Sequence, residues 1–354
     1  MSSRAPRRAL PAVALAAVVA LILGQLVSLW LFSIPYYRIS PGPTAAVEQL
    51  ISVPAAHRHA ARGQVLLTTV LQAPAHITDF LLSWARHDDQ LVSSQDIAGN
   101  LTPDQLQKLD QAQMTASQQY AEVVALRRAG YTVIEHGTGA VVVAVVPHTP
   151  ASGILHPGDV IVSIDGRPTP LVQNMTSILA AARPGQRVTL VVRSTSSAMR
   201  TVTVALTRRP DNASEGFLGV EPVTNDDRFS FPFTVTINSD GIGGPSAGLA
   251  FALGILQELT GADLTKGGRI AATGTIDPDG RVGDVGGVAQ KTVSVTNAGA
   301  TLFLVPPGEY AAAVAHAGPH LKVVKVATFE QALAAIARNG GSLVGLPPAP
   351  SDVK

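Results

Sequence analysis

The stretch DGIGGPSAGLAFALGILQELTG (residues 240–261) decides the fold and the chemistry that we expect from this chain. Glycines and a proline crowd around Ser246, and leucines at helical spacing follow until Thr260-Gly261 ends the helix. Ser246 is therefore expected at the N-cap or in the first turn. The glycines let the loop expose backbone N–H groups, and the helix N-terminus adds unpaired ones with a partial positive charge. An oxyanion could be held there, next to a nucleophilic hydroxyl.

A serine hydroxyl is a weak nucleophile at neutral pH and needs a base. The best candidate is Lys291, which lies in the run GGVAQKTVSVTNAGA (residues 286–300). We expect this run to form a helix that begins after Gly286-Gly287. The neighbours of the lysine are mostly small or apolar, and burial disfavours the ammonium form, so its pKa should fall toward the range of a general base.

Three motifs carry a resemblance to a known family. They are GPSAG (residues 244–248), TGTIDPDGRVGDVGGVAQKT (residues 273–292) and GATLFLVP (residues 299–306). Together they resemble the proteolytic domain of Lon-type proteases, over about residues 215–342. The resemblance implies a mixed α/β fold, not an all-parallel sheet, and a Ser–Lys dyad.

The resemblance also implies a role for individual residues. Ser246 would be the nucleophile and Lys291 its base, and Thr273 would hydrogen-bond the lysine. The amides of Gly244 and Ser246 would lie at the oxyanion site. The chain departs from the pattern at Gly243, where ATP-driven Lon enzymes usually have an acidic residue, although Asp240 is close in sequence.

A second resemblance precedes the first. The phrases ASGILHPGDVIVSIDG (residues 151–166) and PGQRVTLVVR (residues 184–193) resemble a PDZ domain, which we place at residues 125–210. Asp165-Gly166 is expected to form a hairpin turn. The family implies a groove between a strand and a helix that takes an extended peptide by adding a strand. No Gly-Leu-Gly-Phe loop is visible, so HGTGAVVVAVV (residues 136–146) is expected to bind the peptide carboxylate.

The N-terminus predicts a membrane anchor. Arginines at positions 4, 7 and 8 precede a run without charge, Ala9 to Phe32. As a helix this run would span about 36 Å, enough to cross a bilayer. We therefore predict residues 1–8 in the cytoplasm, a transmembrane helix at 9–33, and an extracytoplasmic catalytic domain in a single-pass cell-membrane protein. The alternative is a cleaved signal peptide, but FSIPYYRISPG (residues 32–42) offers no good small-x-small cleavage site.

The remaining segments complete the expected organisation. Residues 34–62 are predicted to be a linker, residues 63–124 a strand plus helices of no assigned family, and residues 343–354 a tail. One of those helices should start with Thr102 as N-cap and Pro103 as its first residue. The whole arrangement resembles the bacterial membrane-anchored PDZ–Lon proteases. Because related proteolytic domains form rings, a homo-oligomer is plausible.

Composition excludes several classes of function. With 26 Lys+Arg against 25 Asp+Glu, the chain has no charge field to hold nucleic acid. It has no cysteine, so a disulfide framework and a thiolate metal site are impossible. His57 and His59 are close together, but two such residues in a linker are more often solvated than ligating. We expect no metal and no cofactor; the expected partners are protein or peptide substrates.

Three other readings remain to be tested. GPSAG (residues 244–248) also fits the nucleophile elbow of α/β-hydrolases, with Asp284 and His316 or His320 as partners, but an elbow needs a strand leading directly into the serine. The run before Lys291 ends like a phosphate loop, yet Gln290 replaces the required glycine, so we expect an ATP-independent endopeptidase. The third is a catalytically inactive, membrane-tethered PDZ adaptor.

Overall fold

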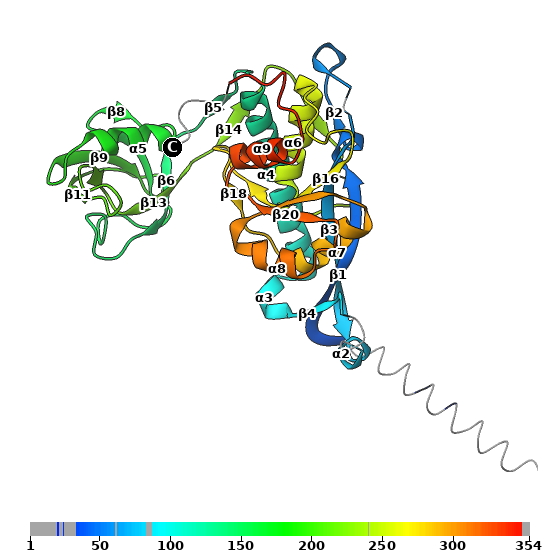
Figure 1. The fold of residues 1–354 in the computed structure, drawn as a ribbon. Coiled ribbons are helices and arrows are strands. Elements are labelled where there is room, and N and C mark those ends of the chain that lie inside the picture. The colour runs from blue at the N-terminus through cyan, green and yellow to red at the C-terminus, as the bar shows by residue number, and fades with distance from the viewer. Residues whose placement is uncertain are drawn as a thin grey trace, which may run out of the picture. The chain divides into compact units, whose positions relative to one another are not determined.

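The chain divides into two compact units. The computed structural model describes residues 20, 24, 33–60, 62–82, 87–239 and 241–348. One unit combines residues 1–131 with residues 233–354, and we call it the discontinuous unit (Figure 1). The other, residues 132–232, is the inserted unit. The boundaries differ from the expected ones, because residues 215–232 belong to the inserted unit and the segment before residue 125 belongs to the discontinuous unit.

A mixed six-stranded sheet is the centre of the discontinuous unit. In sheet order its strands are β20 (Lys322–Lys325), β19 (Leu302–Val305), β16 (Arg269–Ala272), β3 (Gln64–His76), β1 (Ser33–Ala46) and β4 (Gln90–Ser93). The pairs from β20 to β3 are parallel, and β1 is antiparallel to both β3 and β4. The expectation of a mixed sheet is confirmed.

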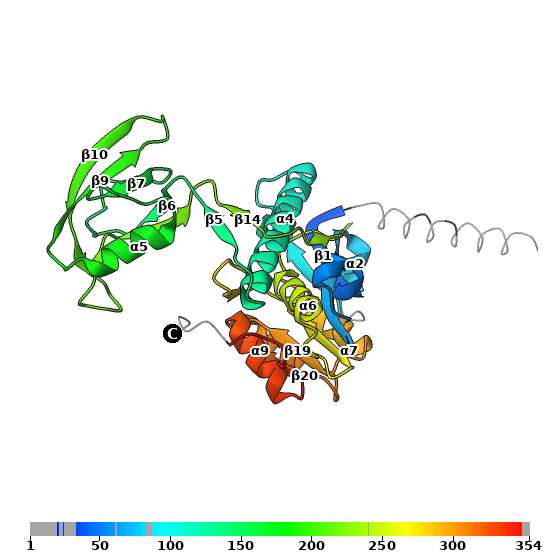
Figure 2. The same cartoon turned by 90° about the horizontal axis from the view of Figure 1, so that it is seen from above.

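Helices cover both faces of this sheet. On one face, α7 (Val288–Asn297) and α8 (Tyr310–Ala315) share a core with Leu66, Ala271 and Phe303. Because side chains alternate along a strand, the neighbouring buried residues of the same strands face the other way. There α6 (Gly248–Thr260) packs on β3 and β16, and Figure 2 shows α4 (Pro103–Arg128) alongside it.

Helix α6 is buried all round, from Gly248 to Leu259. The leucine spacing indicated an amphipathic helix; the alanines, Phe251 and glycines between the leucines let α4 cover its other side. Helix α4 begins as predicted, with Thr102 in a capping box and Pro103 in the first turn.

Short elements complete the discontinuous unit. They are η1 (Val47–Gln49), β2 (Ile51–Ser52), η2 (Ala55–His57), α2 (Ile77–Leu81), α3 (Ser94–Ala98), β15 (Thr236–Ile237), β17 (Thr275–Ile276), β18 (Val282–Gly283), η3 (Pro307–Glu309) and α9 (Phe329–Arg338). Strand β15 pairs with β2, and β17 pairs with β18.

The inserted unit has its own sheet and core. Its elements are β5 (Ile134–His136), β6 (Ala140–Val145), β7 (Val160–Ile164), β8 (Arg167–Pro168), α5 (Val172–Ala181), β9 (Arg187–Arg193), β10 (Met199–Ala205), β11 (Thr207–Arg208), β12 (Gly216–Phe217), β13 (Val220–Thr224) and β14 (Arg228–Ser230). The sheet order is β10-β9-β7-β6-β13, so β13 is an edge strand. Asp165 and Gly166 both have positive φ, which confirms the predicted hairpin turn.

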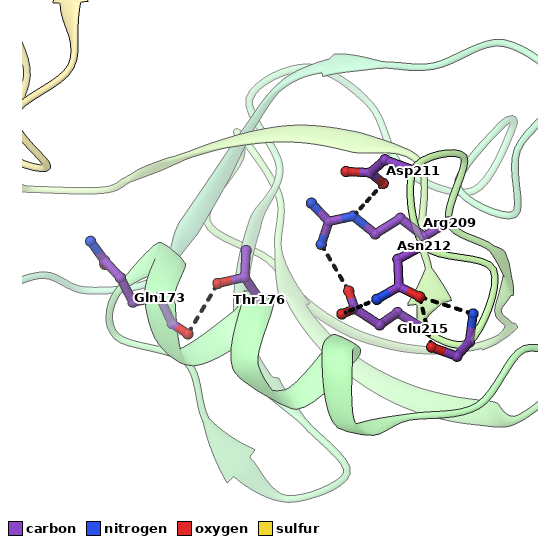
Figure 3. A network of polar contacts seen from close by, with 7 residues as sticks. Gln173, Thr176, Arg209, Asp211, Asn212 and Glu215 are labelled. Carbon is purple, nitrogen blue, oxygen red and sulfur yellow. Dashed lines mark hydrogen bonds and ion pairs between the residues drawn. The ribbon is translucent and has the colours of Figure 1, made fainter. Parts of the chain in front are cut away.

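A turn between β11 and β12 leads to the edge of that sheet. In this turn Arg209 donates to Asp211 at 2.8 Å and to Glu215 at 3.2 Å, and Asn212 donates to Glu215 at 2.8 Å. Figure 3 marks these contacts with dashed lines. These contacts close the turn just before Gly216. The chain then passes through Gly219, whose φ is +86°, into β13.

The predicted transmembrane helix and single-pass membrane location are corrected. Among the described residues, none of the helices combines the length and the apolar character that a membrane crossing requires. Residues 1–19, 21–23 and 25–32 lie outside the described residues. Ser33, the expected end of the helix, is instead the first residue of β1 and pairs with His76 of β3. The fold class is therefore mixed α/β with a β-rich inserted unit.

The segment expected as a linker, residues 34–62, also contains most of β1. Its prolines indicated an extended linker because a proline cannot donate to a strand ladder. The strand accommodates them, since its pairing with β3 shifts register between Pro41 and Thr44.

Candidate active site

Ser246 lies where an irregular loop enters α6. Strand β15 ends at Ile237, and the turn that holds Ser246 and Ala247 leads directly to Gly248, the first helical residue. Asp240 lies outside the described residues. The carbonyl oxygen of Ser246 accepts hydrogen bonds from Gly274 N at 3.0 Å and from Thr273 Oγ1 at 3.2 Å. The connection after β16 therefore fixes the backbone of the serine.

Lys291 lies on α7, and the residue is only 2% exposed. Its Nζ donates a hydrogen bond to Thr273 Oγ1 at 3.2 Å. Thr273 thus joins the lysine to the serine backbone. Helix α7 begins after its N-cap Gly287, which has a φ of +67° and leaves no room for a Cβ, because that atom would lie 2.7 Å from Val70 Cγ1.

Burial changes the charge of this amine. Loss of hydration lowers the pKa of Lys291 from 10.5 to about 8, against an opposing effect of the Glu309 carboxylate. Burial also raises the pKa of Glu309, and the nearby Asp284 adds to this effect. A substantial fraction of Lys291 is therefore neutral near physiological pH, as a general base must be.

Ser246 and Lys291 line the same cavity, of about 800 Å³. Among its other lining residues, the valines, leucines and isoleucines are Ile39, Leu67, Val70, Leu71, Val92, Ile97, Ile242 and Val285. Asp110 and Asp284 are the carboxylates in this lining. The cavity thus has the size and the apolar walls of a site for a peptide segment.

The amides of the loop differ in their availability. Gly244 N–H donates to Asp110 O at 3.0 Å, so it is occupied in this structure and does not match its expected oxyanion role. Within the described part of the chain, the N–H groups of Ser246 and Ala247 have no backbone acceptor. Sequence reasoning missed Ala247. The rule that the first N–H groups of a helix lack partners would have identified it one position beyond Ser246.

The alternative triad does not assemble. Asp284 lines the cavity, whereas His316 is exposed on the end of α8 and its Nδ1 contacts Ala312 O. His320 is also exposed and is absent from the cavity lining. The loop between β15 and Ser246 also separates this site from a nucleophile elbow, in which a strand runs directly into the serine.

The expected solvated role of His57 is wrong. Its ring stacks on Phe233 with centroids 4.1 Å apart, and its Nδ1 lies 3.2 Å from the hydroxyl of Tyr131. Within the described residues, no group of three or more His, Cys, Asp or Glu side chains is arranged to hold a metal ion.

The segment of the inserted unit that was expected to be a carboxylate-binding loop, residues 136–146, is mostly a strand instead. Residues 140–145 form β6, which lies between β7 and β13, so ladders on both sides use its backbone groups. A pair of successive N–H groups that point away from their backbone neighbours lies instead at Gly219 and Val220. Leu218 O accepts Ala151 N and Gly219 O accepts Val146 N. Because N–H and C=O of a trans peptide point in opposite directions, the N–H groups of Gly219 and Val220 point away from those partners.

Comparisons with known proteins agree with this division. Residues 238–334 match the family model of the Lon protease (S16) C-terminal proteolytic domain, and residues 129–206 match that of the PDZ domain. The chain therefore carries a Lon-type proteolytic domain and a PDZ domain, as the motifs predicted.

Individual relatives match only parts of the chain. A Lon protease of Bacillus thuringiensis (strain Al Hakam) is 40% identical over 63 residues, 18% of this chain. The chain spans only 8% of the length of that relative. The PDZ domain of an SdrC-like protein from Listeria monocytogenes is 24% identical, with a TM-score of 0.23, and the match covers 24% of this chain and 87% of that domain. A solution structure from Geobacillus thermodenitrificans is 28% identical, with a TM-score of 0.22, 24% coverage here and 95% there.

Burial of the amine should make Lys291 destabilising. Between pH 8 and 10.5 the unfolded chain binds more protons than the folded one, so stability rises with pH in this window. We expect Lys291→Met to raise the free energy of unfolding at pH 7, by on the order of 2 kcal/mol, and to remove that rise. Urea unfolding between pH 7 and 10.5 measures both. Lys322→Met, an exposed control on β20, should change neither. A less stable Lys291→Met chain would contradict this.

Proposed function

We propose that this chain is a serine endopeptidase in which Ser246 is the nucleophile and Lys291 the general base. The observation that carries the proposal is that both residues line one cavity, where burial brings the pKa of the lysine to about 8. The match to a Lon-type proteolytic domain supports it. Thr273 keeps the amine in place through its hydrogen bond.

In the first half of the reaction, neutral Lys291 accepts the proton of the Ser246 hydroxyl as Oγ bonds to the carbonyl carbon of the scissile peptide. The carbonyl electron pair moves onto oxygen, and the N–H groups of Ser246 and Ala247, which have no backbone acceptor among the described residues, would bind that oxyanion. Protonated Lys291 then gives the proton to the leaving nitrogen as the C–N bond breaks, which leaves an acyl-enzyme and a free amine.

Water completes the turnover. Lys291, neutral again, takes a proton from a water molecule as its oxygen bonds to the acyl carbon. The second tetrahedral intermediate collapses, the bond to Ser246 Oγ breaks, and the lysine returns the proton to that oxygen. No step uses a nucleotide, so we expect turnover without ATP.

The PDZ domain supplies a place for the substrate chain. We propose that an extended peptide adds to the edge of β13, with α5 beside it, and that its carboxylate meets the N–H groups of Gly219 and Val220. Such a pair of successive N–H groups is a common anion-binding arrangement. Strand β13 also contains Pro222, which has no N–H and so limits the donors on that edge.

Removal of the nucleophile tests the enzyme against the inactive adaptor. We expect a fluorophosphonate probe to label the wild-type chain without nucleotide, and Ser246→Ala to abolish labelling because that variant lacks the proposed nucleophilic oxygen. Lys291→Met should reduce labelling at least 100-fold. The measurement is in-gel fluorescence, with retained circular dichroism spectra. A His316→Ala, His320→Ala double variant is the control and should label normally. An unlabelled wild type would favour the adaptor.

The pH dependence should report the buried amine. The neutral lysine is the active form, so the labelling rate should be low at pH 6 and rise through a midpoint near pH 8 to a plateau. The labelling rate is measured at each pH from 6 to 10 by quenching the reaction at successive times. A midpoint below pH 7 would point to a histidine or a carboxylate as the base instead of Lys291.

Peptide capture should depend on Gly219. A Cβ there would lie 2.1 Å from the side chain of Thr149, and the φ of +86° disfavours any other residue. We expect Gly219→Ala to weaken binding of a C-terminal peptide library at least tenfold in a pull-down. Gly153→Ala is the matched control, since its φ is +72° and nothing lies near its Cβ. Equal binding by both variants would contradict the proposed groove.

A further inference from the structure

The loop that leads to Ser246 is held mainly by α4. Its backbone is intrinsically adaptable, because Gly241 and Gly244 both have positive φ. Three hydrogen bonds join it to α4: Gln118 Nε2 donates to Ser239 Oγ at 2.6 Å, Gly244 N donates to Asp110 O at 3.0 Å, and Ser117 Oγ donates to Pro245 O at 2.9 Å. Helix α4 therefore determines where this loop lies.

Of the three hydrogen bonds between α4 and the loop, the one from Ser117 is closest in sequence to Ser246. Ser117 is 3% exposed, and it lies 128 positions before Pro245 in the chain. Its Oγ also lies against the start of α6, since a Cβ on Gly248 would be 2.7 Å from it. The other donor to Pro245 O is Gly248 N, at the longer distance of 3.3 Å. Ser117 is thus the stronger of the two contacts that hold this carbonyl.

The Pro245 carbonyl and the Ser246 N–H belong to one peptide group. No cis peptide bond occurs in the described chain, so these two groups point in opposite directions. A donor that fixes Pro245 O on the α4 side therefore directs the Ser246 N–H to the opposite side. Donation to the carbonyl also polarises the peptide, which makes its N–H a better donor.

We propose that Ser117 is a positioning residue that aims the Ser246 N–H at the oxyanion. This role rests on the proposed function, in which that N–H binds the developing negative charge. Ser117 is not among the residues that line the cavity, so its effect should be smaller than the roughly 10²–10³-fold typical for loss of an oxyanion donor. Loss of one neutral hydrogen bond corresponds to about a fivefold to tenfold change in rate.

The residue lies outside the segment that matches the proteolytic family, which begins at residue 238. It comes from the region 63–124, to which the sequence assigned no family. A single serine on a helix carries no pattern of its own, and only the packing of α4 on α6 brings its hydroxyl to Pro245.

The test compares the reactivity of Ser246 in the full-length chain. We expect Ser117→Ala to lower kinact for a fluorophosphonate probe about fivefold to tenfold and to leave KI unchanged, since the cavity walls are intact. Thr115→Ala is the matched control, because that exposed hydroxyl bonds only to Gln111 O within α4. It should keep the wild-type kinact. Thermal melts of all chains establish that each variant is folded.

Each outcome separates this role from its alternatives. A Ser117→Ala chain with wild-type kinact would overturn the positioning role. If that variant does not fold, Ser117→Cys, which keeps the shape but donates weakly, takes its place, and a wild-type kinact would again overturn the role. Failure of the probe to label the wild-type chain would overturn the proposed function itself, whatever Ser117 does.

Discussion

The hydrogen bond from Lys291 Nζ to Thr273 Oγ1 joins two parts of the fold that arrive from different sides. The lysine comes from α7 on one face of the sheet, and α6, which follows the serine, lies on the other. Thr273 follows the end of β16 between them. Its hydroxyl accepts from the amine and donates to Ser246 O, so this single side chain relates both candidate catalytic residues to the sheet.

Several features near this centre oppose folding. An amine is buried, and α6 needs glycines at close contacts with Ser117 and Val47. Farther away, burial raises the pKa of Glu122 to about 7, although Val235 N donates to it. The large apolar layers on both faces of the sheet, which include α6 buried from end to end, offset these terms. Proteins commonly hold strained or desolvated groups at functional sites in this way.

Local patterns in the sequence predicted what depends on neighbours in the chain. The cap of α4 at Thr102, the turn at Asp165 and the placement of Ser246 before a helix all follow from short-range rules. The candidate catalytic residues, Ser246 and Lys291, were predicted from motifs. Nothing local could show that β3 pairs with β16, about 200 positions later, or that the Gly244 amide is already bound to α4. The uncharged N-terminal run suggested a membrane span, but no helix among the described residues could cross a membrane, and Ser33 is a strand residue.

The insertion of one unit into the other has a consequence for evolution. The chain leaves the discontinuous unit at Tyr131 and re-enters it at Phe233, and His57 contacts both rings. The outgoing and returning segments pair as β5 and β14. For the discontinuous unit, the inserted unit therefore resembles a loop whose two ends lie close together. The free energy of closing such a loop depends only weakly on its length. At this position one binding domain could replace another during evolution while the discontinuous unit keeps its fold. The protein could acquire new binding partners in this way.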